Sequence, residues 1–241
     1  MNIVLDSHTH TIASGHAYST LHEMSREAAD RGLSLLGITE HSMTMPGTCH
    51  EYHFHNMRML TREMYGIQVM HGAEVNIMGY DGSLDMKDAL LAQMDVVIAS
   101  LHIPCIKPGT KEENTAALLH AMENPYVNII GHPDDSRYPV DYEKLVRKAK
   151  ERKVLLELNN TSLHPKSSRK DARPNDEILL RLCMEYEAPI ILGSDAHTQE
   201  DIGNFQYALL LLEEIGFPKE LVVNRSVEDY KKYINRFTLK R

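Results

Sequence analysis

Two histidines separated by one residue, His8 and His10, follow a short apolar run near the N-terminus. Residues two apart on a β-strand point to the same side of the sheet, so both imidazoles can reach one cation. Asp195 and His197 repeat this spacing near the other end of the chain. Imidazole and carboxylate together suit zinc, manganese or iron, so the two pairs predict a metal site. Asp6, two residues before His8, is placed to orient a ring through its second nitrogen.

Polar side chains also stand at the ends of other apolar runs, and one acidic residue, Glu74, lies within a run. Six of the 14 histidines occupy such ends, where chance would place about three if strand ends make up about a fifth of a barrel. A buried polar group without a partner is costly, so this concentration indicates a functional cluster and not a core. The six are His8, His10, His41, His102, His132 and His197.

The elements that position these residues alternate along the chain. Near-continuous apolar runs are typical of parallel strands covered on both faces, and amphipathic runs between them predict helices. The predicted strands are 3–11, 35–41, 68–76, 96–102, 127–132, 154–160 and 189–197. The predicted helices are 21–31, 52–64, 85–93, 112–123, 141–152, 175–187, about 205–215 and 226–237.

This alternation predicts an α/β fold of parallel βα units. Seven units fit a closed, TIM-barrel-like structure better than an open sheet, because polar residues stand at one end of every strand. Barrel enzymes place their chemistry at the carboxyl ends of the strands, which is where the metal site is expected. No change in composition marks a second domain, so residues 1–241 are predicted to form one domain.

The overall composition excludes some classes of protein. The formal net charge of −8 disfavours binding to long nucleic acids or anionic membranes, which attract basic surfaces. No apolar run approaches the ~18 residues of a membrane span, and no signal-like segment opens the chain. Cys49, Cys105 and Cys183 follow no ligand spacing and indicate reduced thiols. We therefore expect a cytoplasmic protein.

An ordered set of motifs covers nearly the whole chain. It opens with His8-Thr9-His10-Thr11, Ser14-x-His16-Ala17-Tyr18-Ser19 and Thr39-Glu40-His41, and continues through 52–58, 72–76, His102, 131–133, 157–160 and 193–197. This set resembles the PHP (polymerase and histidinol phosphatase) superfamily, in particular its YcdX-type phosphatases. Two positions depart from the pattern, because the usual aspartate and glycine on either side of His41 are Glu40 and Ser42 here.

The resemblance implies a distorted (β/α)7 barrel that holds three divalent metals, usually zinc and sometimes manganese or iron. The first metal would be held by His8, His10, Glu74 and Asp195. The second would be held by His102, His132 and a bridging Glu74. The third would be held by His16, His41 and His197; His16 lies in a loop that strand positions alone do not identify. Glu74, Asp195 and His197 are the expected catalytic residues.

The expected reaction is hydrolysis of a phosphate monoester by metal-bound hydroxide at this trinuclear site, because cations stabilise the negative charge of the transition state. A cationic site in an acidic protein would attract a small phosphorylated substrate. Arg58 is the candidate contact for the substrate phosphate, and Asn160 is a candidate for a hydrogen bond to the substrate. The sequence leaves the substrate and the general acid open.

Three alternatives stay open at this point. One is a PHP phosphodiesterase or nuclease acting on nucleotides or short oligonucleotides. The second is an amidohydrolase, which also begins with a His-x-His pair but resembles longer, eight-stranded chains. The third is a metal-binding regulatory protein without catalysis.

The remaining histidines of interest lie outside this ligand set. One local group either borders the mouth of the barrel or forms an ordinary solvated segment; it consists of His50, His53 and His55. His71 is expected to face the helices.

Overall fold

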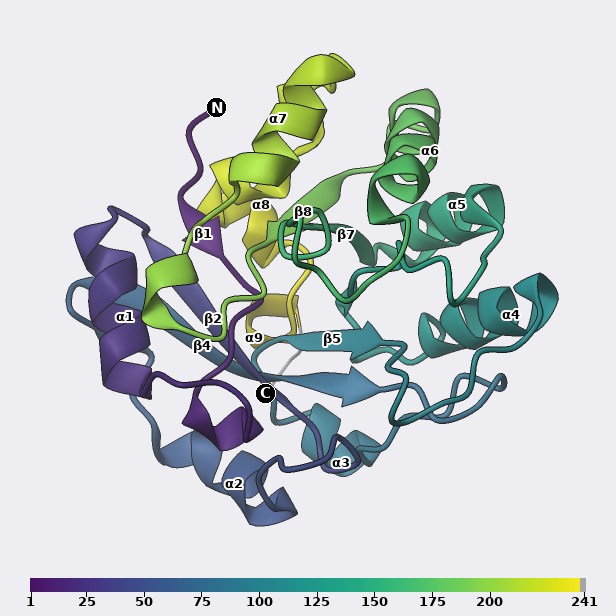
Figure 1. The fold of residues 1–241 in the computed structure, drawn as a ribbon. Coiled ribbons are helices and arrows are strands. Elements are labelled where there is room, and N and C mark those ends of the chain that lie inside the picture. The colour runs from purple at the N-terminus through teal and green to yellow at the C-terminus, as the bar shows by residue number, and fades with distance from the viewer. Residues whose placement is uncertain (239–241) are drawn as a thin grey trace.

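The computed structural model describes residues 1–238, in which parallel strands form a nearly closed barrel. Helices lie around the outside of the strands (Figure 1). The sheet order is β1-β2-β4-β5-β6-β7-β8, and the short β3 (Glu63–Met64) pairs antiparallel with β4. The parallel strands are β1 (Leu5–Asp6), β2 (Leu35–His41), β4 (Ile67–Asn76), β5 (Val97–Ser100), β6 (Ile129–Ile130), β7 (Leu155–Asn159) and β8 (Ile190–Gly193). These seven strands confirm the predicted (β/α)7 barrel.

Two sets of hydrogen bonds connect the first and last strands of the barrel. Beyond β1, Thr9 pairs with Ala196 in a parallel bridge, and the Asp195 amide donates to the His8 carbonyl at 2.9 Å. Lower down, the Asn224 side chain bridges the strands by donating to the carbonyls of Leu5 (3.2 Å) and Leu192 (2.8 Å). These bonds satisfy strand edges that would otherwise stay unpaired.

The lumen of the barrel is apolar at the bottom and polar at the top. The lower layer contains Leu5, Leu35, Met70, Ile98, Ile129, Leu155 and Ile191, and the buried Tyr230 and Ile234 pack against it. The same strand faces continue upward into polar side chains, since Met70 leads by steps of two to Glu74 and Leu155 leads to Glu157. The barrel therefore carries a packed core below and a polar site at the carboxyl ends of its strands.

The outer helices follow the strands in sequence. They are α1 (Leu21–Asp30), α2 (Glu51–Asn56), α3 (Asp88–Leu91), α4 (Lys111–Ala121), α5 (Tyr142–Arg152), α6 (Ala172–Glu185), α7 (Gln206–Glu214), α8 (Val227–Lys231) and α9 (Asn235–Thr238). Within residues 1–238, none of these helices combines the length and apolar character needed to cross a bilayer.

Several predicted elements are wrong in extent: the strands expected over 127–132 and 189–197 and the helix expected over 85–93 are shorter in the structure, and three further differences have a visible physical reason. The strand expected over 3–11 keeps regular pairing only at Leu5–Asp6, because the chain turns into the lumen to present His8 and His10. The helix expected over 52–64 ends at Asn56 and is followed by a 3-10 turn and β3. There the Arg62 guanidinium donates to backbone carbonyls that a continuous helix would have used itself. The helix expected over 226–237 is divided into α8 and α9.

Candidate metal centre

The nine predicted ligand residues gather at the carboxyl ends of the barrel strands. Their imidazoles form a continuous group in which neighbouring ring centroids lie 4.2 to 5.9 Å apart. The strand ends contribute His41, Glu74, His102 and His132, and the segments after β1 and β8 contribute the two-residue pairs. His16 comes from the loop after β1, and its ring is exposed. Residues far apart in sequence thus form one cluster.

Glu74 is fully buried at the centre of this cluster, and its two oxygens face different sets of histidines. Oε1 lies 2.9 Å from His132 Nε2 and 3.2 Å from His102 Nε2. Oε2 lies 3.4 Å from His8 Nε2 and 3.5 Å from His10 Nε2. A carboxylate in this position can be shared by two adjacent cations, one on each side.

The donors around His8 and His10 have the spacing of a coordination polyhedron. Asp195 Oδ1 lies 3.7 Å from His8 Nε2 and 3.4 Å from His10 Nε2, opposite the contacts made by Glu74 Oε2. Ligands about 2.0–2.1 Å from a tetrahedral zinc ion are separated by about 3.4 Å. The four distances between the histidine nitrogens and the carboxylate oxygens therefore fit a bound zinc-sized cation.

Hydrogen bonds fix which nitrogen of several rings points into the cluster. A ring Nδ1 that faces an acceptor must carry the proton, which leaves Nε2 with a bare lone pair. Such bonds join His8 Nδ1 to Glu157 Oε1 (2.6 Å), His102 Nδ1 to Asn76 Oδ1 (2.7 Å) and His197 Nδ1 to the Asp195 carbonyl (2.9 Å). The free Nε2 atoms are in the form that binds metals.

Four buried atoms of the centre accept or donate no hydrogen bond within the described part of the chain: His8 Nε2, His10 Nε2, His41 Nδ1 and Glu74 Oε2. His41 Nδ1 lies 2.8 Å from Glu74 Oε2, but without the alignment of a hydrogen bond. Bare lone pairs that face carboxylate oxygens repel each other, and buried polar groups are normally paired. A divalent cation between them removes both penalties, so the residues fit a metal.

Both carboxylates of the centre are held in their charged form. Burial raises the pKa of Glu74, but nearby His102 and His8 more than offset this and hold it well below its usual range. Burial likewise acts against the charged form of Asp195, yet His8, His10 and Arg169 hold its pKa well below the ordinary value. Anionic carboxylates are the form required of a metal ligand.

The imidazoles differ in their electrostatic surroundings. Burial, followed by the nearby His41 and His197, holds the pKa of His10 well below its usual range, so His10 is neutral as a ligand must be. Burial also lowers the pKa of His8, but the charges of Glu157 and Glu74 outweigh it and raise the pKa well above normal. A proton and a cation would therefore compete for His8.

Two predicted ligand sets are grouped differently in the structure. His10, His41 and His197 each bring one ring nitrogen within 4.8 Å of the others, whereas the resemblance implied His16 with the last two. Glu74 and His102 group with His41, and His132 groups with His8 and Asp195. The His16 ring lies beside them, 4.8 Å from His41 between centroids. Gly15 makes this possible, because it has φ of 81° and its Cα faces the Gly47 carbonyl without room for a side chain. The role of His16 stays a prediction.

Glu157, which lies in the 157–160 motif and was given no role from the sequence, supports two histidines of the cluster. Its Oε1 accepts from His8, and its Oε2 accepts from the His132 amide (2.8 Å) and from Asn159 Nδ2 (3.1 Å). Gly193 makes room for it, since a Cβ there would lie 1.7 Å from Glu157 Oε1. The sequence could have indicated this, because residues 155, 157 and 159 point to the same side of a strand, and 155 is an apolar lumen residue.

The prediction that Asp6 orients a ring is wrong. Its buried carboxylate accepts backbone amides instead, from Gly203 at 2.9 Å, Ser194 at 3.3 Å and His8 at 3.4 Å. Asp6 therefore fixes the backbone that carries the ligands, while Glu157 orients the His8 ring.

Arg169 borders the centre and was also missed. It lies in the loop between β7 and α6, where strand patterns give no information. Its Nη2 donates to Asp195 Oδ2 at 3.0 Å, and its Nη1 donates to Asn159 Oδ1 at 3.2 Å and to Ser162 Oγ at 3.1 Å. A guanidinium thus stands directly behind a proposed ligand.

The two predicted substrate contacts lie elsewhere. Arg58 lines a hollow with Arg62 and Arg236, and Arg62 pairs with Asp95 just before β5, at the opposite end of the strands. Asn160 Oδ1 accepts from the amides of Tyr207 (2.9 Å) and Ala208 (3.2 Å) in the first turn of α7. Neither placement supports a contact with substrate at the metal centre, and both roles stay untested predictions.

The other histidines make local contacts. His71 faces away from the lumen, as expected, with Nε2 2.8 Å from the Thr61 carbonyl. His50 precedes α2 and accepts from the Tyr52 amide, and His55 lies 3.6 Å from Glu51 in the same helix. None of these three belongs to a group that could hold a metal within residues 1–238.

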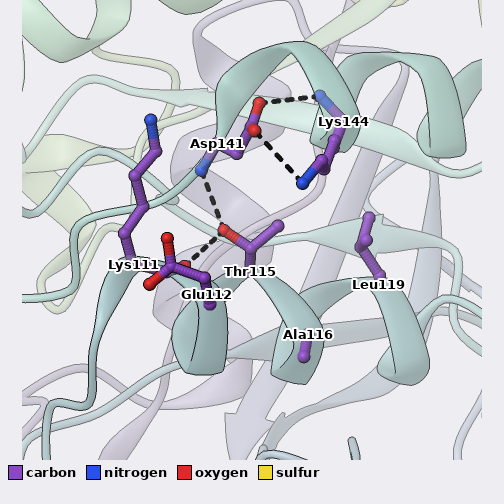
Figure 2. A pocket seen from close by; sticks show the side chains of 7 residues that line it. All are labelled: Lys111, Glu112, Thr115, Ala116, Leu119, Asp141 and Lys144. Carbon is purple, nitrogen blue, oxygen red and sulfur yellow. Dashed lines mark hydrogen bonds and ion pairs between the residues drawn. The ribbon is translucent and has the colours of Figure 1, made fainter.

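A separate hollow lies between one side of α4 and the first turn of α5 (Figure 2). The Asp141 amide donates to Thr115 Oγ1 at 2.8 Å across it, and Asp141 also pairs with Lys144. Its charges balance, because Lys111 and Lys144 stand against Glu112 and Asp141. The hollow lacks the imidazoles and orphaned atoms that distinguish the metal centre.

Comparison with known proteins identifies the family and the fold of the chain. A PHP domain model matches residues 6–237. A probable phosphatase of Clostridium novyi is 47% identical over 234 residues, covering 97% of this chain and 95% of its own, and one of Acetivibrio thermocellus is 44% identical over 236 residues, covering 98% and 97%. The crystal structure of histidinol phosphate phosphatase from Lactococcus lactis, complexed with zinc, L-histidinol and phosphate, has a TM-score of 0.62 at 20% identity and covers 89% of this chain and 94% of that one. The fold is therefore shared with that enzyme, and over almost its entire length the chain belongs to the PHP-domain family.

Proposed function

We propose that the protein is a metal-dependent phosphatase that hydrolyses phosphate monoesters of small molecules. The observation that carries this proposal is the buried Glu74, whose two oxygens face separate sets of imidazole nitrogens, those of His8 and His10 having no hydrogen-bond partner within residues 1–238. Relatives named as probable phosphatases, at 43–47% identity across the chain, support the same reaction class.

Three groups of residues would hold divalent ions, with zinc favoured by the many imidazoles. His8, His10, Glu74 and Asp195 would hold the first, Glu74, His102 and His132 the second, and His41 and His197 with His16 or His10 the third. When bound, such ions polarise phosphoryl oxygens and supply hydroxide at neutral pH. Glu157 and Asn76 keep two of the rings in the tautomer that this binding requires.

Arg169 is the group best placed to bind the substrate phosphate. Three of its five N–H groups bond Asp195, Asn159 and Ser162, and the other two bond no residue within 1–238. Its side chain keeps 15% of its surface exposed. A planar guanidinium with free donors beside a cationic centre is suited to phosphate oxygens.

Replacing Arg169 with alanine is expected to lower kcat/KM for a phosphomonoester about 10- to 100-fold, because a hydrogen bond to a charged group contributes about 1.5–3 kcal/mol. Lysine at this position should recover part of the loss, since it restores the positive charge but not the planar set of N–H donors. Activity is compared at saturating zinc with bound metal quantified on the same samples, so that loss of substrate binding is separated from loss of support for Asp195. Arg58→Ala is the matched control and should behave as wild type; an effect confined to Arg58→Ala would reverse the assignment.

A panel of substrates tests the function itself. The metal-loaded protein is expected to release phosphate from small phosphomonoesters and to leave phosphodiesters and amides intact. Cleavage of diesters or short oligonucleotides in preference to monoesters would favour the nuclease alternative. Absence of any hydrolysis by fully metallated protein would favour a binding protein.

A further inference from the structure

A chain of hydrogen bonds leads from the segment before α3 to the metal centre. It begins at Asp85, passes through the buried Asn76 at the end of β4, and ends at Nδ1 of His102. Asp85 Oδ2 accepts from Asn76 Nδ2 at 2.7 Å, and Asn76 Oδ1 lies 2.7 Å from His102 Nδ1. Asp85 itself contacts no residue of the cluster, so its influence on the centre passes through Asn76.

Asp85 fixes the orientation of the Asn76 amide. Its Oδ1 accepts from Ser42 Oγ (2.5 Å) and the Asn76 backbone amide (3.0 Å), and its Oδ2 also accepts from the Thr44 amide (3.0 Å). Asn76 Nδ2 donates to Asp85 and to Ser42 Oγ at 3.1 Å. An acceptor-only carboxylate demands donors on every side, so the NH₂ group of Asn76 must face Asp85.

The orientation of this amide decides the tautomer of His102. With its NH₂ group turned to Asp85, Asn76 presents only a carbonyl oxygen to His102, so when Nε2 binds a cation the proton is held on Nδ1. His102 Nε2 then points a bare lone pair toward Glu74 Oε1, 3.2 Å away. If the amide turned over, its NH₂ group would face Nδ1, the proton would move to Nε2, and the metal-binding lone pair would be lost.

We propose that Asp85 is a positioning residue that, through Asn76, holds His102 in its metal-binding tautomer. Ser42 occupies a position where the PHP pattern usually has glycine. Its hydroxyl accepts from the Asn76 side-chain amide and stabilises the same amide orientation. This inference rests on the proposed metal centre and adds a residue that lies outside its ligands.

Replacing Asp85 with asparagine tests the proposal with almost no change of shape. Either orientation of the new amide places an NH₂ group against an existing N–H donor, from Asn76 or Thr44. With the new NH₂ group at the Oδ2 position, turning the Asn76 side-chain amide removes the conflict with Asn76 Nδ2 and presents an NH₂ group to His102. With the NH₂ group at the Oδ1 position, the opposing donor is the Asn76 backbone amide. Partners of metal ligands typically contribute 10- to 100-fold to affinity, so titration of metal-free Asp85→Asn with cobalt should show one class of site weakened by about that factor.

Nitrogen NMR of zinc-loaded protein supplies a readout that loop destabilisation alone would not move. The His102 signal, assigned by its loss in His102→Gln, should report a proton on Nδ1 in wild type and on Nε2, in whole or part, in Asp85→Asn. Asp88→Asn is the matched control, because it removes the same charge from an exposed residue of α3. That variant should keep both the tautomer and the affinity of wild type.

The double variant Asp85→Asn with Asn76→Asp should restore both readouts. A carboxylate at position 76 accepts from His102 Nδ1 with one oxygen and from the new amide at position 85 with the other. Wild-type tautomer and affinity in Asp85→Asn, or a double variant no better than the single one, would overturn the inference. Failure of wild type to bind metal would instead overturn the proposed function.

Discussion

Glu74→Gln is expected to reduce hydrolysis to background and to lower the metal content of the purified protein. Glutamine keeps the shape of the side chain but replaces one oxygen with an NH₂ group. That group would face either His102 and His132 or His8 and His10, whichever oxygen it replaces. Because Glu74 is the common neighbour of two proposed ion positions, the loss should exceed the ~100-fold typical of residues that only support ligands.

Glu27→Gln provides the matched control for this change. Glu27 pairs with Arg31 on α1, and both side chains are partly exposed. Exposed ion pairs contribute little to stability, so this variant should keep wild-type activity and metal content. Full activity in Glu74→Gln, measured in the same assay with the bound metal quantified, would contradict the shared role of Glu74.

Asp195→Asn is the second change with a large expected effect, at least about 100-fold on kcat by comparison with the losses seen for supporting residues. Asp195 has φ of 54°, a region that asparagine also tolerates, so the backbone should be preserved. The variant removes the charge that faces His8 and His10 and the acceptor that holds Arg169. Both metal content and kcat should therefore fall.

Asp171→Asn separates the charge effect from any backbone effect. Asp171 also has a positive φ, of 50°, and accepts from Ser136 Oγ at 2.7 Å away from the histidine cluster. This control should retain activity. If Asp195→Asn retained both its metal and its turnover, Asp195 could not be a ligand of the centre.

Strand parity explains why much of the centre was predictable. β2 was predicted with its exact limits, and His41 stands at its end. Glu74 shares the lumen face of β4 with the apolar residue four positions earlier, and the histidines after β5 and β6 follow apolar strands. In a parallel barrel these ends converge, so side chains from many strands come together without long-range information.

The residues that were missed depend on contacts that no local pattern encodes. Arg169 comes from an irregular loop, and its position is fixed by bonds to Asp195 and Asn159. Asp85 reaches the centre only through Asn76. Arg58 was predicted as a phosphate contact, but the helix expected over 52–64 ends at Asn56, and Arg58 lies beside Arg62 and Arg236.

The central claim is that hydrolysis depends on divalent metal held at this cluster. Its most direct test removes metal from the wild-type protein with a chelator and restores zinc or, separately, manganese in steps, with bound metal and phosphomonoester hydrolysis measured on the same samples. The protein without metal should be inactive, and activity should return in proportion to the metal bound. Undiminished hydrolysis by the metal-free protein would contradict the claim.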